Sequence, residues 1–134
     1  MNAVAKDILT PHVVSVTEDM ELRTVAQLFE DEAITGAPVV DEQGHVVGVI
    51  SRSDLVAHDL TTRRGVPPEV LAAATVKDVM TPLVVTVEED TPIPEVAARM
   101  AQQGIHRVIV VDKAQQLRGI VTSMDVLWWV AAQG

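Results

Sequence analysis

The stretch that decides the fold reads Gly48-Val49-Ile50-Ser51-Arg52-Ser53-Asp54, and it returns 71 positions later as Gly119-Ile120-Val121-Thr122-Ser123-Met124-Asp125. Each copy has a glycine, two aliphatic residues, a hydroxyl residue, two variable positions and an aspartate. Shifted by 71 residues, the segment 5–56 falls on 76–127 without a gap, and 17 of the 52 positions are identical. Chance gives only a few identities over that length. The chain is therefore an internal duplication, which constrains every further prediction of its fold.

Both repeats predict the same order of secondary structure. A Thr-Pro dipeptide ends a lead-in segment, and a β-branched run follows as a first strand. An amphipathic helix with apolar residues at helical spacing comes next. Two apolar strands joined by a turn follow, and a last helix starts near Ser53 in one repeat and near Met124 in the other. The expected ranges are strand 13–16, helix 22–32 and strands 37–40 and 46–50, then strand 84–87, helix 94–103 and strands 108–111 and 117–121.

The turns between the paired strands differ. The first, Asp41–Gly44, contains a glycine that can adopt a positive φ angle. The second, Asp112–Gln116, has no glycine. We therefore expect the second hairpin to be looser than the first.

This pattern predicts the α/β (α+β) fold class, with two β-α-β-β-α repeats packed with pseudo-twofold symmetry around a cleft. Residues 1–60 are expected to form repeat 1 and residues 76–134 repeat 2. Residues 61–75 are expected to form a linker with a short helix that begins at Pro67-Pro68. A unit of about 55 residues is too small to bury both faces of its sheet, so we expect the two repeats to stack.

Composition excludes several classes of function. The 10 Lys and Arg residues against 19 Asp and Glu give a net charge of −9, which disfavours binding to nucleic acid or to an anionic membrane surface. The absence of cysteine excludes disulfides and Cys-ligated metals. The sequence has no apolar run long enough to span a membrane and no signal-peptide pattern at its start, so a soluble cytoplasmic protein is expected.

The repeated Ser/Thr-x-x-Asp element has two interpretations. It resembles a capping box, in which the hydroxyl and the acid bind backbone N–H groups at the start of a helix. Alternatively, Asp54 and Asp125 are carboxylates at the edge of a cleft that accept hydrogen bonds from the vicinal hydroxyls of a ribose. Both are possible together, because the hydroxyl can cap the helix while the aspartate faces the cleft.

With these motifs the chain resembles a pair of CBS (cystathionine β-synthase) domains, the tandem unit called a Bateman module. The Thr-Pro lead-ins, Ala37-Pro38-Val39-Val40-Asp41 and both glycine-to-aspartate blocks carry the resemblance, which covers residues 5–131. It implies a regulatory module that binds an adenosyl ligand such as AMP, ADP, ATP, S-adenosylmethionine or a dinucleotide. It also implies that Asp54 and Asp125 hold the ribose, with Ser51 and Thr122 as their hydroxyl partners.

Two further segments are similar to stretches in the gamma subunit of AMP-activated protein kinase. They are Pro82-Leu83-Val84, which the similarity places along an adenine, and Ile105-His106-Arg107-Val108, whose His-Arg pair it places at a phosphate. An arginine suits that role because its guanidinium is planar, always charged and bidentate. The alternative is that Arg107 lies at the surface beside one of the many carboxylates.

The resemblance implies two sites, each of which combines the ribose aspartate of one repeat with the first strand of the other. The first site comprises Ser51, Asp54, Pro82, Leu83, Val84, Ile105, His106 and Arg107. The second and weaker site comprises Thr122, Asp125, Pro11, His12, Val13, Ile34 and Thr35. Gly36 stands in the second site where the first has its arginine, so the second site is expected to be empty or to take a neutral adenosyl group.

The sequence thus predicts a sensor of an adenine nucleotide or S-adenosylmethionine, not an enzyme, because no nucleophile set and no metal-ligand spacing are present. The rival hypothesis is a structural dimerisation module with a vestigial cleft. We expect a homodimer that forms through apolar helices such as 94–103 and 124–132. In the adjacent pair Trp128-Trp129, one ring is expected in the core and the other at the surface or against a partner.

Overall fold

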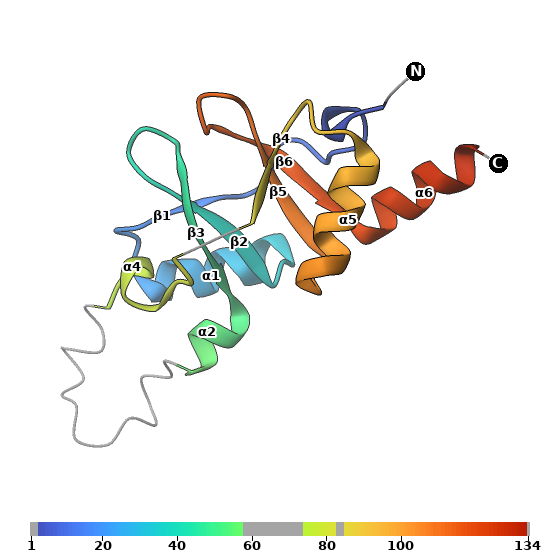
Figure 1. Ribbon diagram of the computed structural model, residues 1–134. Coiled ribbons are helices and arrows are strands. Elements are labelled where there is room, and N and C mark those ends of the chain that lie inside the picture. The colour runs from blue at the N-terminus through green and yellow to red at the C-terminus, as the bar shows by residue number, and fades with distance from the viewer. Residues whose placement is uncertain (1–2, 58–73, 83–84, 134) are drawn as a thin grey trace. The chain divides into compact units, whose positions relative to one another are not determined.

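The computed structural model describes residues 3–57, 74–82 and 85–133 (Figure 1). The predicted linker helix, Leu83 and Val84 lie outside these residues. The elements of the first repeat are a 3-10 turn η1 (Ala5–Asp7), β1 (Val16–Thr17), α1 (Leu22–Glu32), β2 (Gly36–Val40), β3 (Val46–Ser51) and α2 (Arg52–Ala57). Those of the second repeat are α4 (Val76–Val79), β4 (Thr86–Glu88), α5 (Ile93–Gln103), β5 (Arg107–Val111), β6 (Leu117–Thr122) and α6 (Ser123–Gln133).

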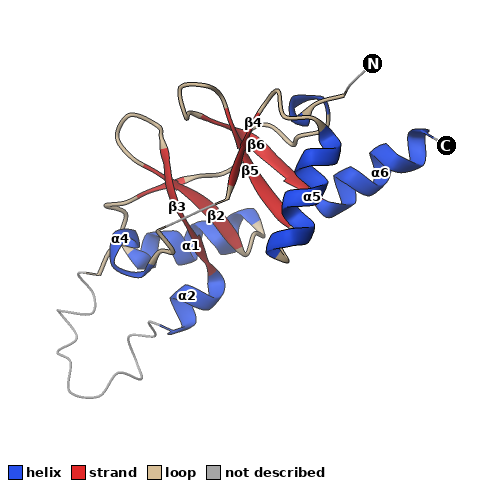
Figure 2. Cartoon of the chain, viewed as in Figure 1, coloured by secondary structure: helices blue, strands red, loops and turns tan. Residues whose placement is uncertain are grey.

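Each repeat builds a three-stranded sheet, in the order β1-β2-β3 or β4-β5-β6 (Figure 2). The first strand runs parallel to the second, which pairs antiparallel with the third. The predicted α+β class and the β-α-β-β-α order of both repeats are confirmed.

The predicted first strand, 13–16, was wrong in its bounds, because the first repeat pairs only Val16 and Thr17 with β2. The compact units of the fold divide the chain between Val13 and Val14, so Val13 belongs to a different unit from β1. In the second repeat the strand starts at Thr86 instead of residue 84.

The two hydrophobic cores use equivalent positions of the two repeats. Each is built from buried residues of the three strands and from one stripe of the long helix, as the helical spacing predicts. Phe29 and Met100 fill the same place in α1 and α5, and both are buried. The first core comprises Val16, Leu22, Val25, Phe29, Ala37, Val39, Ile50, Ala74 and Val76. The second comprises Ala5, Val87, Val96, Met100, Val108, Val110 and Val121.

The compact units exchange the lead-in segments of the repeats. One unit joins Met1–Val13 to Val85–Gly134, and the other is Val14–Val84. The N–H of Lys6 donates to the carbonyl of Glu89 at 2.9 Å, and the N–H of Lys77 donates to that of Glu18 at 3.0 Å. Each lead-in, residues 3–13 or 74–82, is therefore held by the repeat to which it does not belong in sequence.

The long helices end in the same left-handed conformation with different residues. The cap of α1 is Ala33, with φ of 54°, and the cap of α5 is Gly104, with φ of 65°. A residue with a Cβ is strained there, whereas glycine is not. We expect Ala33→Gly to raise the free energy of unfolding by about 0.5–1 kcal/mol. Urea denaturation measures it, and an unchanged or lower midpoint would contradict the expectation.

The two hairpins close with the same backbone hydrogen bonds, although only the first has a glycine. Gly44 has a φ angle of 85° in the first hairpin, and Gln115, the equivalent residue of the second hairpin, has a φ angle of 65°. The expectation of a looser second hairpin stays a prediction, because the closing hydrogen bonds are the same in both hairpins. Desolvation raises the pKa of the Asp41 carboxyl, but hydrogen bonds from the N–H groups of His45 and Gln43 and the nearby His45 ring outweigh it and leave the pKa below its ordinary value.

Candidate functional site

The Ser51–Asp54 element caps α2, as one of the two interpretations predicts. The N–H of Ser51 donates to Oδ2 of Asp54 at 2.8 Å, and the Ser51 hydroxyl donates to the same oxygen at 3.0 Å. Capping thus occupies one carboxylate oxygen. Within residues 3–57, 74–82 and 85–133, Oδ1 of Asp54 accepts no hydrogen bond.

The Thr122–Asp125 element repeats this arrangement at the start of α6. The N–H of Thr122 donates to Oδ2 of Asp125 at 2.8 Å, and the N–H of Asp125 donates to the Thr122 hydroxyl at 3.2 Å. Both aspartates are half-buried. Within the described part of the chain, Oδ1 of Asp125 also accepts no hydrogen bond. Capping and binding to a ligand hydroxyl are therefore compatible at both positions.

The glycine that opens each block lies where the lead-in of the other repeat crosses the strand. Thr10 exchanges backbone hydrogen bonds with Ile120, and Thr81 exchanges them with Val49. A Cβ on Gly119 would lie 2.4 Å from the carbonyl oxygen of Thr10, and one on Gly48 would lie 2.6 Å from that of Thr81. Only glycine allows so close an approach. The glycines were quoted as part of the sequence motif, but their role in seating the lead-ins was missed.

This crossing places several predicted site residues within one compact unit. Pro11, His12 and Val13 follow Thr10 directly, and they belong to the same unit as Thr122 and Asp125. His12 has φ of 58°, a left-handed conformation that is uncommon for a residue with a side chain and often marks a functional position. The same crossing brings Pro82, next to Thr81, into the unit of Ser51 and Asp54.

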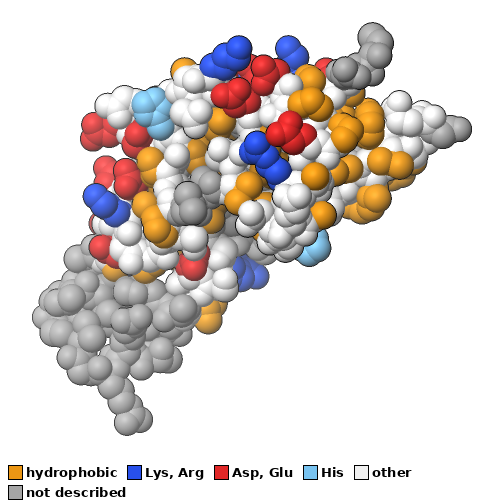
Figure 3. Space-filling model, viewed as in Figure 1, with side chains coloured by type: hydrophobic (Ala, Val, Ile, Leu, Met, Phe, Trp, Pro, Cys, Tyr) orange, Lys and Arg blue, Asp and Glu red, His pale blue; other side chains and the backbone are white. Residues whose placement is uncertain are grey.

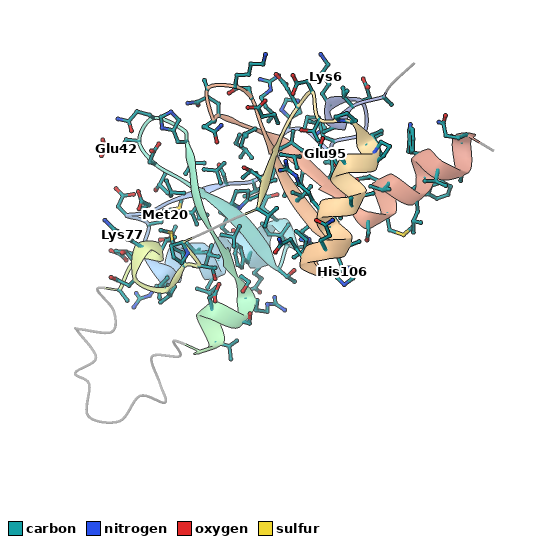
Figure 4. All side chains as sticks on the ribbon, viewed as in Figure 1. Lys6, Met20, Glu42, Lys77, Glu95 and His106 are labelled. Atoms are coloured by element: carbon teal, nitrogen blue, oxygen red, sulfur yellow. The ribbon has the colours of Figure 1, made fainter. Side chains whose placement is uncertain are left out.

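The residues predicted to face phosphate lie in two different environments. Arg107 is the exposed first residue of β5 and lies opposite Thr122 of β6. Figure 4 shows His106 at the C-terminal end of α5, where its carbonyl accepts the N–H of Ser123 at 2.9 Å. His106 and Ile105 line a groove beside α5, which Arg107 does not. The predicted first site also needs Ser51 and Asp54, which belong to the other compact unit, so that combination stays a prediction.

The first repeat has the equivalent segment without its arginine. Ile34 is half-buried, and the carbonyl of Thr35 accepts the N–H of Arg52 at 2.8 Å, as that of His106 does for Ser123. Gly36 lies opposite Ser51 where Arg107 lies opposite Thr122. The difference between the two predicted sites is therefore a difference between equivalent strand positions.

The described residues of the unit that contains the second repeat form hollows of two kinds. An apolar groove of about 430 Å³ lies between α5 and α6. A hollow of about 420 Å³ of mixed charge lies at the loop before α5, between Lys6, Asp90 and Lys113. The described residues contain no group of three His, Asp or Glu side chains that could hold a metal ion. No helix among them is long and apolar enough to cross a membrane.

Known structures resemble the chain over its full length. The protein CBSX2 of Arabidopsis thaliana, solved in complex with AMP, has a TM-score of 0.81 and 26% identity and covers 97% of each chain. The CBS domain pair of protein MJ0100, solved with 5′-methylthioadenosine and S-adenosyl-L-methionine, has a TM-score of 0.76 and 29% identity and covers 100% of each chain.

Most of the curated relatives are longer proteins, and the chain matches one part of each. Subunit gamma-3 of the human 5′-AMP-activated protein kinase is 30% identical over 113 residues, which are 84% of this chain and 23% of that protein. The chain spans 22% to 23% of the length of three further relatives, two of which are an L-aspartate semialdehyde sulfurtransferase and an inosine-5′-monophosphate dehydrogenase.

The family model for the CBS domain matches residues 5–60 and again residues 76–132, which together are most of the chain. These matches fall on the two copies of the duplication, with the glycine-to-aspartate block inside each. The chain therefore belongs to the CBS domain family and contains two CBS domains in tandem.

Proposed function

We propose that the protein is a regulatory module that binds an adenosyl nucleotide, AMP, ADP or ATP, or S-adenosylmethionine, and that it has no catalytic activity of its own. One observation carries the proposal. Asp54 and Asp125 each use one oxygen to cap a helix, and the other oxygen is free of hydrogen bonds within the described residues. A carboxylate fixed in this way is prepared to accept hydrogen bonds from two vicinal hydroxyls. The likeness to CBS pairs solved with AMP and with S-adenosylmethionine supports it.

The proposed roles follow the chemistry of each side chain. Asp54 and Asp125 bind ribose hydroxyls, and the lead-in residues Pro82 and Pro11 lie along the base, as the family resemblance implies. The guanidinium of Arg107, which is always charged and can donate two parallel hydrogen bonds, binds the phosphate. Ligand binding regulates by favouring one packing of the repeats over another. A cytoplasmic location and a homodimer stay predictions that belong to this proposal.

A thermal-shift screen tests the proposed function directly. AMP, ADP, ATP, S-adenosylmethionine and adenosine are each added in excess, and native mass spectrometry then gives the stoichiometry. A ligand at 100 times its dissociation constant adds about 2.7 kcal/mol of stability, which raises the melting temperature of a chain this size by roughly 10 °C. If no adenosyl compound raises it, the rival function, a structural dimerisation module, is the better one.

The two aspartates are expected to differ in their effect on binding. We expect Asp54→Ala to weaken AMP binding more than Asp125→Ala, because the site predicted for Asp54 also has Arg107, whereas Gly36 stands at the equivalent place in the other. Loss of hydrogen bonds to a charged acceptor costs roughly 1.5–3 kcal/mol, about 10-fold to 150-fold in dissociation constant. Titration calorimetry measures both variants.

Loss of the cap acts as an internal control in this comparison. Both substitutions remove an equivalent hydrogen bond of 2.8 Å from a backbone N–H, and Asp54→Ala also removes the bond of 3.0 Å from the Ser51 hydroxyl. Urea denaturation of both variants therefore measures how far they differ in stability, apart from ligand binding. Equal losses of AMP affinity would contradict the assignment of Arg107 to the site of Asp54.

A further inference from the structure

The lead-in of the first repeat is anchored as far as Thr10. The N–H of Ala5 donates to the carbonyl of Thr91 at 2.8 Å, and Ala5 is fully buried. The N–H of Thr10 donates to the carbonyl of Ile120 at 2.8 Å, and the carbonyl of Thr10 accepts the N–H of Ile120 at 3.1 Å. Within the described chain, the backbone of the next residues, 11–13, makes no hydrogen bond. The bonds of Thr10 can therefore open locally while the core stays closed.

Residues 11–13, which we call the connecting segment, join the two compact units. Val13 is the last residue of one unit, and Val14 is the first residue of the other, two positions before β1. The chain therefore passes from one unit into the other directly after it leaves its anchor at Thr10.

His12 has a left-handed conformation in the middle of the connecting segment. Its φ angle is 58°, and the residue is exposed. A residue with a Cβ is strained at this angle and keeps it only where its surroundings favour it. Hinges are short stretches of loop whose φ and ψ angles absorb a conformational change. A strained residue without backbone hydrogen bonds, placed where two units join, suits that role.

The anchor of this segment lies on the strand that leads to Asp125. Ile120 and Thr122 are two residues apart on β6, which is about 7 Å along the strand. Thr122 donates its N–H to Oδ2 of Asp125, which leaves Oδ1 for the ribose hydroxyls of the proposed function. The proposed function also places Pro11 along the base of the same ligand. A nucleoside held by Asp125 is therefore expected to contact the connecting segment close to its anchor at Thr10.

Gly119 allows the anchor to form. A Cβ at this position would lie 2.4 Å from the carbonyl oxygen of Thr10. Gly119 contributes no side chain to the site, so an effect of this residue on a ligand must act through the position of Thr10 and of the segment that follows it.

We propose that a nucleoside bound at Asp125 holds Thr10 and the connecting segment in place, and that Gly119 is a positioning residue for this site. Occupancy thereby fixes the connection between the two compact units. The inference rests on the proposed function and names the segment through which binding regulates. Coupling of this kind is reciprocal, so an anchor that is weakened must weaken binding by the same factor.

Adenosine is the probe for this coupling, because it carries the base and the ribose without a phosphate. A net charge of −9 repels phosphate, and Figure 3 shows acidic side chains at several places on the visible surface. Two variants each retain one of the two proposed ribose carboxylates. Asp54→Ala keeps the site of Asp125, and Asp125→Ala keeps the site of Asp54.

Hydrogen exchange of the two variants, with and without adenosine, tests the coupling. At 100 times its dissociation constant, adenosine should slow exchange at the amides of Thr10 and Ile120 in Asp54→Ala by at least about tenfold, with a ceiling of about 100-fold. The equivalent crossing in the other unit provides the control, because Thr81 and Val49 exchange backbone hydrogen bonds of 2.9 and 3.0 Å. Their amides should slow by less than about twofold in Asp54→Ala.

The variant Asp125→Ala should give the opposite result. Adenosine should leave the amides of Thr10 and Ile120 unchanged there, because the carboxylate next to their strand is gone. Equal slowing of these amides in both variants would overturn the coupling. Unchanged amides in Asp54→Ala, whether or not titration calorimetry shows that adenosine binds to this variant, would overturn it as well.

A substitution at the crossing tests the positioning role of Gly119. In the Asp54→Ala background, Gly119→Ala should raise the dissociation constant of adenosine at least about fivefold, the lower end of typical coupling between sites. In the Asp125→Ala background it should leave that constant unchanged. Gly48→Ala is the matched control, since its Cβ would lie 2.6 Å from the carbonyl oxygen of Thr81, in the other unit. It should leave adenosine binding to Asp54→Ala unchanged.

These results separate the coupling from the proposed function. A purely structural role of Gly119 would lower adenosine affinity equally in both backgrounds, which would overturn its assignment as a positioning residue. If Gly119→Ala fails to fold, hydrogen exchange decides alone, because it needs no substitution at the crossing. A wild-type melting temperature that no adenosyl compound raises would overturn the proposed function and the coupling together. A raised melting temperature with unchanged exchange at Thr10 would overturn the coupling alone.

Discussion

Gly119→Ala should unfold roughly 8 °C below the wild type. The added methyl group would lie 2.4 Å from the carbonyl oxygen of Thr10 and 2.9 Å from the side chain of Leu9. A backbone atom held by its own hydrogen bond to Ile120 cannot move aside at low cost. Overpacking of this kind costs about 2–3 kcal/mol, which for a chain this size gives that shift in melting temperature.

The same substitution at Gly36 provides the control. A Cβ there would lie 3.4 Å from its nearest neighbour, an ordinary contact, so Gly36→Ala should change the stability by less than about 0.5 kcal/mol. Hydrogen exchange adds a local readout, because the amide of Thr10 should lose protection in Gly119→Ala. If both variants have the melting temperature of the wild type, the lead-in that contains Thr10 does not pack against Gly119 as described.

Arg107→Ala should remove most of the preference for AMP over adenosine. On a chain with a net charge of −9, a phosphate is repelled unless a local cation binds it. The loss of a charge-assisted, bidentate contact costs roughly 1.5–3 kcal/mol, so AMP affinity should fall about 10-fold to 150-fold while adenosine affinity stays nearly unchanged. Binding of AMP to the wild type should also weaken with salt.

Two variants separate a direct contact from the overall charge. Arg118→Ala removes the same charge from the next strand, where Arg118 is exposed and pairs with Glu89 at 3.3 Å, and it should leave the preference intact. Arg107→Lys keeps the charge without the planar fork and should give an intermediate loss. Equal melting shifts from AMP and adenosine in the wild type would show that Arg107 does not bind phosphate.

The sequence predicted what depends on local pattern. The period of 71 residues, the helices that contain Val25 and Val96, and the capping role of Ser51 all follow from spacing and residue type, and the structure bears them out. The placement of Ser51 and Thr122 at strand-to-helix junctions followed from the same pattern. Local physics suffices for these features because each involves residues close together in the chain.

Features that depend on distant contacts could not be predicted from local pattern, and only the family resemblance grouped residues 11–13 with Thr122 and Asp125. The pattern of a repeat is the same whether its lead-in packs on its own repeat or on the other, so the pairing of Thr10 with Ile120 left no local signal. The groove beside α5 needs the structure as well, because only side-chain burial shows that Leu127 and Trp128 are exposed. Glutamine has no preference for the left-handed conformation, so the residue type gave no indication that Gln115 adopts it.

The exchanged lead-ins constrain the origin of the molecule. A single repeat would leave the edge of its own strand at the Gly119 position uncovered, because the segment that covers this edge comes from the other copy. A chain of one repeat would therefore need a second chain with which to exchange its first residues, as in a domain-swapped pair. With both repeats in one chain the exchange is intramolecular, and the high effective concentration of the linked halves favours it without any new contact.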